Sequence, residues 1–142
     1  MTVRPYRAAD EDAVAALWQE CFPVDRPWHE PRADIGRKLD EHPELFLVGF
    51  EGDRLVATVL AGWDGHRGWL YRCAVASDCR RRGFGRQVVD AALARLAALG
   101  CPKVNLQVVG SNRDVVAFYE RLGFAVEDRV SLGKALDPAS GR

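Results

Sequence analysis

The 142-residue chain has no net charge and no long apolar run. Its 20 Lys and Arg residues balance 20 Asp and Glu residues, so the formal charge at pH 7 is zero. A neutral chain has no overall field that would attract a nucleic acid or an anionic membrane. No apolar run approaches the roughly 18 residues that cross a bilayer, and the first residues form no apolar targeting segment. We therefore expect a cytoplasmic protein with neither a nucleic acid nor a membrane as partner.

The chain also lacks the cysteine pairs that bind zinc. Its four cysteines are Cys21, Cys73, Cys79 and Cys101, and no two of them form a C-x-x-C pair. None of the three histidines is spaced from them as in a zinc site. We therefore expect reduced thiols and no metal.

Length and composition are those of one globular domain. Domains usually hold about 100 to 200 residues, and the chain is 48% apolar and 28% charged. A chain of this size buries roughly two-thirds of its unfolded surface, which suffices for a core. We find no internal repeat, low-complexity tract or linker. The sequence predicts a single domain over residues 1–142, with a frayed tail at 137–142.

Hydrophobic periodicity predicts alternating helices and strands. The order is strand, two helices, three strands, helix, strand, helix and strand, with one strand–helix–strand crossover. The strands are predicted at residues 2–7, 45–50, 55–62, 69–76, 104–109 and 124–132. The helices are predicted after Asp10, from Pro31 to the stop at His42-Pro43, from the glycine-rich turn to Gly100, and from Asn112 to Gly123.

A glycine-rich, arginine-rich turn precedes the third predicted helix. The segment Arg80–Arg86 reads RRRGFGR and lies where unpaired backbone N–H groups and the helix dipole favour an anion. Gly83 and Gly85 lack Cβ atoms, so the backbone can approach a phosphate closely. The alternative is a solvated basic helix start, and spacing alone leaves both readings open.

Two common phosphate-binding motifs do not match this turn. The segment lacks the G-x-x-x-x-G-K-S/T pattern of a Walker loop. It also lacks the third glycine of the dinucleotide fingerprint, because Val88 stands there. The phosphates of another ligand are therefore implied.

Two motifs resemble those of one enzyme family. Arg80-x-x-Gly83-x-Gly85, after a strand ending in Cys73-Ala74-Val75, resembles motif A of the GCN5-related N-acetyltransferases (GNATs), which reads Arg/Gln-x-x-Gly-x-Gly/Ala. Asn112, seven residues before Tyr119, is similar to the start of their motif B. The resemblance covers nearly the whole chain, and phrases at 64–68, 100–103 and 131–134 further resemble a small bacterial branch, the YpeA-like proteins.

The resemblance implies an α/β (α+β) GNAT fold. Its central sheet is mixed, with six to seven strands, and its fourth and fifth strands are parallel and splayed. About four helices flank this sheet.

The resemblance also implies acetyl-CoA as the cosubstrate. The backbone of the fourth strand would pair with the pantetheine arm, and an N–H there would stabilise the oxyanion of the tetrahedral intermediate. The amides of the glycine-rich turn would bind the pyrophosphate, and the nearby arginines are candidates for the 3′-phosphate. The implied binding residues are Cys73, Ala74, Val75, Arg80, Arg81, Arg82, Gly83, Phe84, Gly85, Arg86 and Asn112.

Tyr119 aligns with the tyrosine that commonly protonates the departing CoA thiolate in this family. A phenol pKa of about 10 lies close enough to a thiol pKa of about 8.5 for proton transfer between them. The alternative is a core tyrosine, which is the usual role of a tyrosine on an apolar helix face.

The sequence shows no obvious general base for the attacking amine. Where relatives often place a glutamate, this chain has Tyr71, Arg72 and Cys73. Gln107 stands where ribosomal-protein alanine acetyltransferases hold a glutamate, which argues against that activity. His66 is about 26 Å of extended strand from Ala74 at roughly 3.3 Å per residue, so it reaches only if the turn folds back.

A water relay is therefore the favoured hypothesis for deprotonation. It would run from backbone carbonyls or from a loop carboxylate such as Asp25 or Glu30. The loops 22–30 and 63–68 are expected to shape the acceptor pocket. Trp28, Trp63 and Trp69 are either part of that pocket or packing residues.

The resemblance thus implies an enzyme that moves an acetyl group from acetyl-CoA to a primary amine by direct attack. The acceptor, a small molecule or a protein amine, is not indicated. A non-catalytic CoA-binding regulatory module is the alternative. RNA binding by residues 80–86 is disfavoured, because Phe84 is the only aromatic residue within the arginine cluster. The sequence does not indicate the oligomeric state. A homodimer is one alternative, since dimers are common in the family that the chain resembles.

Overall fold

A computed structural model describes residues 1–136, which divide into one compact unit, Met1–Asn105, and a second that begins at Leu106. The prediction of one domain stays a prediction, and the tail at 137–142 lies outside the described residues.

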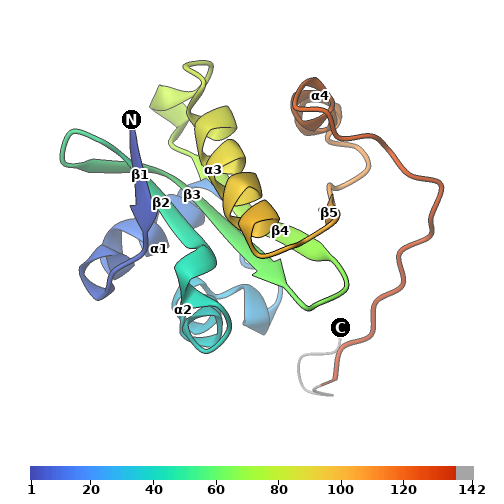
Figure 1. The fold of residues 1–142 in the computed structure, drawn as a ribbon. Coiled ribbons are helices and arrows are strands. Elements are labelled where there is room, and N and C mark those ends of the chain that lie inside the picture. The colour runs from blue at the N-terminus through green and yellow to red at the C-terminus, as the bar shows by residue number, and fades with distance from the viewer. Residues whose placement is uncertain (137–142) are drawn as a thin grey trace. The chain divides into compact units, whose positions relative to one another are not determined.

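The first unit contains a five-stranded sheet in the order β1-β2-β3-β4-β5 (Figure 1). The first four strands are antiparallel neighbours, and β4 pairs with β5 in parallel. A left-handed Gly52 lies in the tight turn between β2 and β3, as the hairpin pattern predicts. The strands are β1 Thr2–Pro5, β2 Phe46–Glu51, β3 Arg54–Trp63, β4 Gly68–Val75 and β5 Val104–Asn105.

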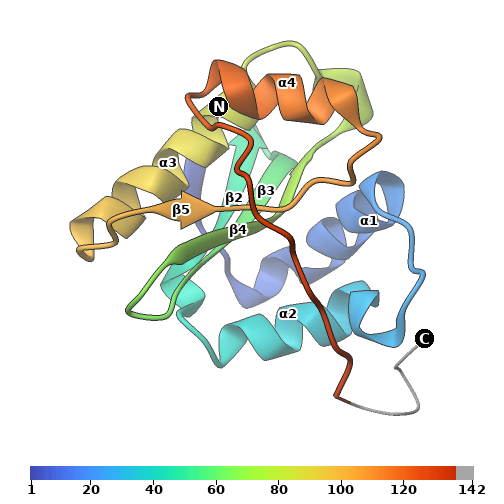
Figure 2. The same ribbon diagram turned by 90° about the vertical axis from the view of Figure 1, so that its right-hand side faces the viewer.

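Three α-helices cover this sheet. Figure 2 shows α3 on one face and α1 and α2 on the other. They are α1 Glu11–Cys21, α2 Pro31–Leu39 and α3 Phe84–Ala98, and all three agree with the predicted helices. Short 3₁₀ turns lie between the main elements: η1 Ala8–Asp10, η2 Pro27–His29, η3 Pro43–Leu45 and η4 Ser77–Cys79. Under α1 and α2, the fully buried Trp18 stacks on Phe46 with ring centroids 5.8 Å apart.

The second unit contains α4, Arg113–Arg121. The Asn112 side chain accepts a hydrogen bond from the Val115 N–H at 3.3 Å, so it caps the helix as predicted. Gly123, with φ of +96°, follows the last turn. Among residues 1–136, no helix has the length and apolar character needed to span a membrane.

The mixed α/β fold with parallel β4 and β5 is confirmed, but the expected strand count is wrong. Residues 1–136 contain five strands rather than six to seven. The strand predicted at 104–109 covers only Val104–Asn105, and the described residues form no strand over 124–132. Their β-branched residues raised the strand propensity, but propensity forms a strand only where a partner pairs with it. Consistent with this, Val109, Val126 and Val130 are at least 75% exposed.

An almost buried ion pair joins β1 to the start of α1. The Arg4 guanidinium donates to both Asp10 carboxylate oxygens, at 2.8 and 2.9 Å, and the Arg7 N–H donates to the same carboxylate at 2.8 Å. The Asp10 side chain is 7% exposed. Its hydrogen bond with Arg4 lowers the pKa of Asp10 below its usual value.

We expect this carboxylate to make the free energy of unfolding depend on pH in acid. Because its pKa is lower in the folded state, its stabilisation is fully present above the unfolded pKa of about 3.9 and is lost as pH falls towards the folded pKa. Asp10→Asn should therefore flatten the pH dependence and lower stability near neutral pH by about 1 kcal/mol. Urea unfolding at several pH values between about 5 and 3 measures this. An unchanged slope would contradict it.

Candidate functional site

The glycine-rich turn before α3 contains two residues with a left-handed backbone. Arg81 has φ of +64° and Gly83 has φ of +80°, so left-handed residues interrupt the extended chain. Such alternation directs successive N–H groups to one side, which is the geometry of an anion-binding nest. Gly83 is the N-cap of α3, and no side chain caps this helix end. The first N–H groups of α3 are therefore not used by a capping side chain.

Charge near the start of α3 also suits an anion. Of the four α-helices in residues 1–136, α3 is the one whose first turn holds no acidic residue. The others hold Glu11 and Asp12 in α1, Asp34 in α2 and Asp114 in α4. The positive end of the α3 dipole is thus not neutralised by its own side chains.

The arginines of the turn have different partners. Arg82 forms an ion pair with Glu51 of β2, and its guanidinium lies 4.7 Å from the centroid of the Phe84 ring. Arg80 donates to the Val75 carbonyl at 3.4 Å. Arg82 therefore links the turn to β2, while Arg80 links it to the end of β4.

A β-bulge interrupts β4 at the start of the predicted binding stretch, residues 73–75. Thr58 pairs with Ala74, and Leu60 pairs with Tyr71. The two β4 residues Arg72 and Cys73 therefore lie opposite the single β3 residue between Thr58 and Leu60. Arg72 has φ of +52°, a left-handed conformation that is strained for a non-glycine residue. The surrounding contacts must therefore hold this conformation.

A buried threonine holds the bulge by two hydrogen bonds. The Trp18 indole N–H donates to Thr58 Oγ1 at 2.8 Å, and Thr58 Oγ1 donates to the Arg72 carbonyl at 2.9 Å. Thr58 is fully buried. The three residues therefore connect α1, β3 and the β4 bulge in one chain of hydrogen bonds.

The Arg72 side chain extends from the bulge under the helices. Its Nε lies 2.9 Å from the Asp34 carboxylate of α2, and its Nη2 donates to the His29 carbonyl at 2.9 Å. The guanidinium lies 4.6 Å from the Trp18 ring centroid and 5.3 Å from that of Phe22. With its side chain only 10% exposed, Arg72 joins β4 to α1, α2 and η2.

The parallel pairing of β4 with β5 is short. It consists of Gly68 with Val104 and Trp69 with Asn105. A Cβ at Gly68 would lie 2.7 Å from Cys101 Sγ and 3.2 Å from Val104 Cγ2, so glycine permits the close approach. The parallel ladder ends at Trp69, whereas β4 continues to Val75. The parallel pairing is therefore confined to the first two residues of β4.

The two loop carboxylates predicted for the water relay, Asp25 and Glu30, both form hydrogen bonds within the region between α1 and α2. Asp25 Oδ1 lies 2.5 Å from His29 Nδ1, and this hydrogen bond lowers the pKa of Asp25. Glu30 caps α2 by accepting the N–H groups of Arg32 at 3.1 Å and Ala33 at 2.8 Å, which lowers the pKa of Glu30. Both carboxylates are therefore weaker bases than usual.

His66, considered above as a base, lies in the turn between β3 and β4. Asp64 Oδ1 accepts the backbone N–H groups of His66 and Arg67, each at 2.8 Å. The Asp64 side chain therefore stabilises this turn, to which His66 contributes its backbone N–H.

The predicted site residues fall in both units. Residues 73–75 and 80–86 belong to the first unit, where Val75 and Arg80 are in contact. Asn112 and Tyr119 belong to the second. Tyr119 is buried, 8% exposed, and makes edge contacts with Phe118 and Phe124. In the same unit Gln107 hydrogen-bonds Ser131.

Sequence reasoning assigned no structural contact to Thr58, Arg72 or His29. Thr58 and Arg72 act through contacts far apart in sequence, so no local pattern marks them. The Asp25–His29 pair has i,i+4 spacing in the sequence, which was the available signal.

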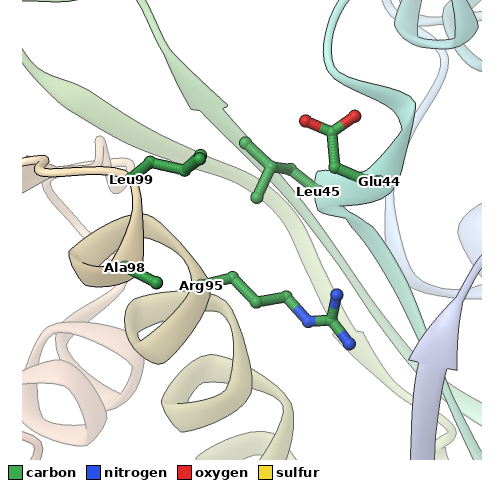
Figure 3. A pocket seen from close by; sticks show the side chains of 5 residues that line it. All are labelled: Glu44, Leu45, Arg95, Ala98 and Leu99. Carbon is green, nitrogen blue, oxygen red and sulfur yellow. The ribbon is translucent and has the colours of Figure 1, made fainter.

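A shallow hollow of about 180 Å³ lies near the other end of α3 (Figure 3). It is lined by Glu44, Leu45, Arg95, Ala98 and Leu99. Arg95 is about 17 Å along the helix axis from Phe84, and no predicted site residue lines the hollow.

Known proteins share both the sequence and the fold. The model of the acetyltransferase (GNAT) family matches residues 11–124. An acetyltransferase of Yersinia enterocolitica serotype O:8 is 40% identical over 136 residues, which cover 96% of each chain. One from Sodalis glossinidius is 41% identical over 137 residues, again 96% of each chain.

A solved structure extends the likeness to the fold. AAC(6')-Iy in complex with the bisubstrate analogue CoA-S-monomethyl-acetylneamine has a TM-score of 0.79 at 15% identity, covering 94% of this chain and 97% of that one. The parallel β4–β5 pairing and the turn before α3 agree with these relatives: the chain belongs to the GNAT family of acetyltransferases.

Proposed function

We propose that this acetyltransferase moves the acetyl group of acetyl-CoA to a primary amine by direct attack, without a covalent enzyme intermediate. The observation that carries the proposal is the nest at Arg81–Gly83 leading into the uncapped start of α3, beside the end of β4. A pyrophosphate is the anion that such backbone donors suit. The complex of AAC(6')-Iy with a CoA-containing bisubstrate analogue supports the same substrate here.

Each predicted residue then has a chemical role. The amides of residues 81–86 bind the pyrophosphate, and Arg80 and Arg81 are candidates for the 3′-phosphate, because Arg82 is paired with Glu51. The backbone of residues 73–75 pairs with the pantetheine arm as an added strand. Asn112 binds the same arm, and Tyr119 donates a proton to the departing thiolate.

The proposed reaction balances without a metal. The amine lone pair forms a bond to the thioester carbon, and the carbonyl electron pair moves to oxygen, where a β4 N–H stabilises it. The carbonyl re-forms as the C–S bond breaks, and the sulfur leaves with the electron pair and takes up a proton. The nitrogen of the primary ammonium ion starts with three protons and the product amide keeps one. It therefore loses one proton before the attack and one after it.

A thiol-release assay tests the function. Acetyl-CoA is offered with spermidine, kanamycin, trialanine and Nα-acetyl-lysine amide, and calorimetry measures acetyl-CoA binding separately. We expect binding together with transfer to at least one amine. Binding without transfer would favour the alternative, a CoA-binding regulatory module, and no binding would reject both. The cytoplasmic location stays a prediction, which cell fractionation tests. The oligomeric state was left open between monomer and homodimer, and light scattering distinguishes the two.

Gly83→Ala should weaken acetyl-CoA binding about tenfold. An alanine is strained at φ of +80°, although nothing lies within 4 Å of its Cβ, so the turn should relax and misdirect its N–H groups. Gly100→Ala is the matched control, because Gly100 follows the other end of α3 with φ of +88° and equally open space. Each should cost about 1 kcal/mol of stability. Equal acetyl-CoA dissociation constants for the two variants, measured by calorimetry, would contradict the prediction.

A further inference from the structure

The proposed reaction needs a group that takes a proton from the amine, because an alkylammonium ion has no lone pair for attack. We propose that His29 is this general base and that Asp25 orients it. The inference rests on the proposed function and adds the base that sequence reasoning did not find.

Asp25 holds the His29 ring through Nδ1, which leaves the other ring nitrogen, Nε2, for a substrate. An ionised carboxylate only accepts hydrogen bonds, so at 2.5 Å from Asp25 Oδ1 the His29 Nδ1 carries the proton. The lone pair of neutral imidazole then lies on Nε2, and among residues 1–136 no hydrogen bond occupies that nitrogen. The ring also packs edge-on against Trp28, with centroids 5.7 Å apart. The His29 side chain is 42% exposed, so the ring is in contact with solvent.

Two arginines fix the turn that carries this ring. Arg72 donates to the His29 carbonyl at 2.9 Å, and Arg37 donates to the Trp28 carbonyl at 2.6 Å. Arg72 is the bulge residue that directly precedes residues 73–75, the proposed thioester-binding stretch. The contact therefore links the η2 turn that carries His29 to the residue next to the proposed thioester-binding stretch.

The carboxylates around His29 are committed to other partners. Asp34 pairs with Arg72 at 2.9 Å and with Arg37 at 3.4 Å. Glu30 caps α2, and its pKa is lowered by the N–H groups it accepts. The His29 imidazole differs from these carboxylates because its Nδ1 pairs with Asp25 while its second ring nitrogen, Nε2, makes no hydrogen bond within residues 1–136. The charged groups of this loop and of the elements packed on it are Asp25, Arg26, Glu30, Asp34, Arg37 and Arg72.

The proposed step moves one proton. His29 Nε2 takes a proton from the ammonium group, which leaves a neutral amine and an imidazolium that Asp25 stabilises. The amine attacks the thioester carbon, the C–S bond breaks, and the thiolate takes up one proton while the new amide nitrogen gives up one. The imidazolium then returns its proton to water, so His29 ends the cycle unchanged.

His29→Asn tests the proposal, because the asparagine amide can keep a hydrogen bond to Asp25 but has no basic nitrogen. We expect kcat/KM to fall about tenfold at neutral pH, the acid limb of its pH profile to disappear, and free imidazole to restore part of the rate. The loss should be larger for Nα-acetyl-lysine amide, with an amine pKa of about 10.4, than for trialanine, with a pKa of about 8. Asp25→Asn should give a smaller loss and keep the acid limb.

His42→Asn is the matched control. His42 is also 42% exposed and pairs with a carboxylate through Nδ1, at 3.1 Å from Glu44, but it lies at η3. Its variant should keep wild-type turnover. Equal pH profiles for wild type and His29→Asn would overturn the base, and so would a lowered rate with the acid limb retained and no rescue by imidazole. Calorimetry separates the two proposals. If the wild type does not bind acetyl-CoA, the proposed function is rejected. If the wild type binds acetyl-CoA and transfers the acetyl group, and His29→Asn does so equally well, only the proposed base is rejected.

Discussion

Thr58→Val is expected to lower the free energy of unfolding by about 3 kcal/mol, although the two side chains have nearly the same shape. Thr58 Oγ1 accepts from the Trp18 indole and donates to the Arg72 carbonyl, and it is fully buried. Valine leaves one buried donor and one buried acceptor without this partner, at about 1 to 3 kcal/mol each. The left-handed Arg72 also loses a contact that holds its strained backbone.

Urea unfolding measures this loss. Thr2→Val is the matched control, because Thr2 is an exposed threonine on β1 and its substitution should change stability by no more than about 0.5 kcal/mol. A double-mutant cycle with Trp18→Phe, which removes the indole N–H, should give a coupling energy of about 1 kcal/mol with Thr58→Val. Additive effects, or a loss no larger than that of Thr2→Val, would contradict the proposed hydrogen-bond chain.

The same substitution should also affect turnover, because the bulge sets the direction of residues 73–75. We expect kcat/KM for acetyl-CoA to fall in Thr58→Val under conditions where the variant is fully folded. The expected loss of both stability and turnover would act through the backbone of β4 rather than through contact with substrate.

The elements with local signals were predicted well. Apolar spacing predicted α1, the proline start predicted α2, and the N-cap Asn112 predicted α4. The three-stranded meander of β2, β3 and β4 follows from short apolar runs with turn residues between them. In each case the residues that specify the element lie within a few positions of one another.

The features that sequence reasoning missed depend on contacts between distant residues. The bulge at Arg72 needs Thr58, 14 residues earlier, and Thr58 in turn needs Trp18, 40 residues before it. These three residues are too far apart to fall within the short windows over which a sequence pattern is recognised. The same limit explains the false strand at 124–132, since residues that favour a strand do not reveal whether a partner will pair with them.

The search for a base failed for a different reason. Sequence reasoning found no glutamate at the β4 positions and weighed the turn and loop residues His66, Asp25 and Glu30, but it did not consider His29. Asp25 and His29 have i,i+4 spacing, but only the folded η2 turn brings the carboxylate to the ring. A functional residue on a loop has no periodicity to mark it.

Tyr119→Phe is expected to lower kcat about 100-fold and to leave the acetyl-CoA dissociation constant nearly unchanged. The change removes only the phenol oxygen, so the edge contacts of the ring with Phe118 and Phe124 remain. Without an acid, the thiolate must leave unprotonated or take its proton from water, and the C–S cleavage step slows. Thiol release gives kcat, and calorimetry gives the dissociation constant.

The control must separate chemistry from packing, because Tyr119 is buried and its hydroxyl could serve stability alone. Tyr6→Phe removes the same atom from a tyrosine that stacks on Phe46 at 4.4 Å, outside the proposed site, and should keep wild-type kcat. Thermal unfolding shows whether either variant is destabilised. If Tyr119→Phe loses stability but keeps full turnover in its folded state, Tyr119 is a packing residue. If kcat falls while stability and acetyl-CoA binding hold, only a role for the phenol in the chemical step accounts for the loss, because binding and fold have each been measured and found intact.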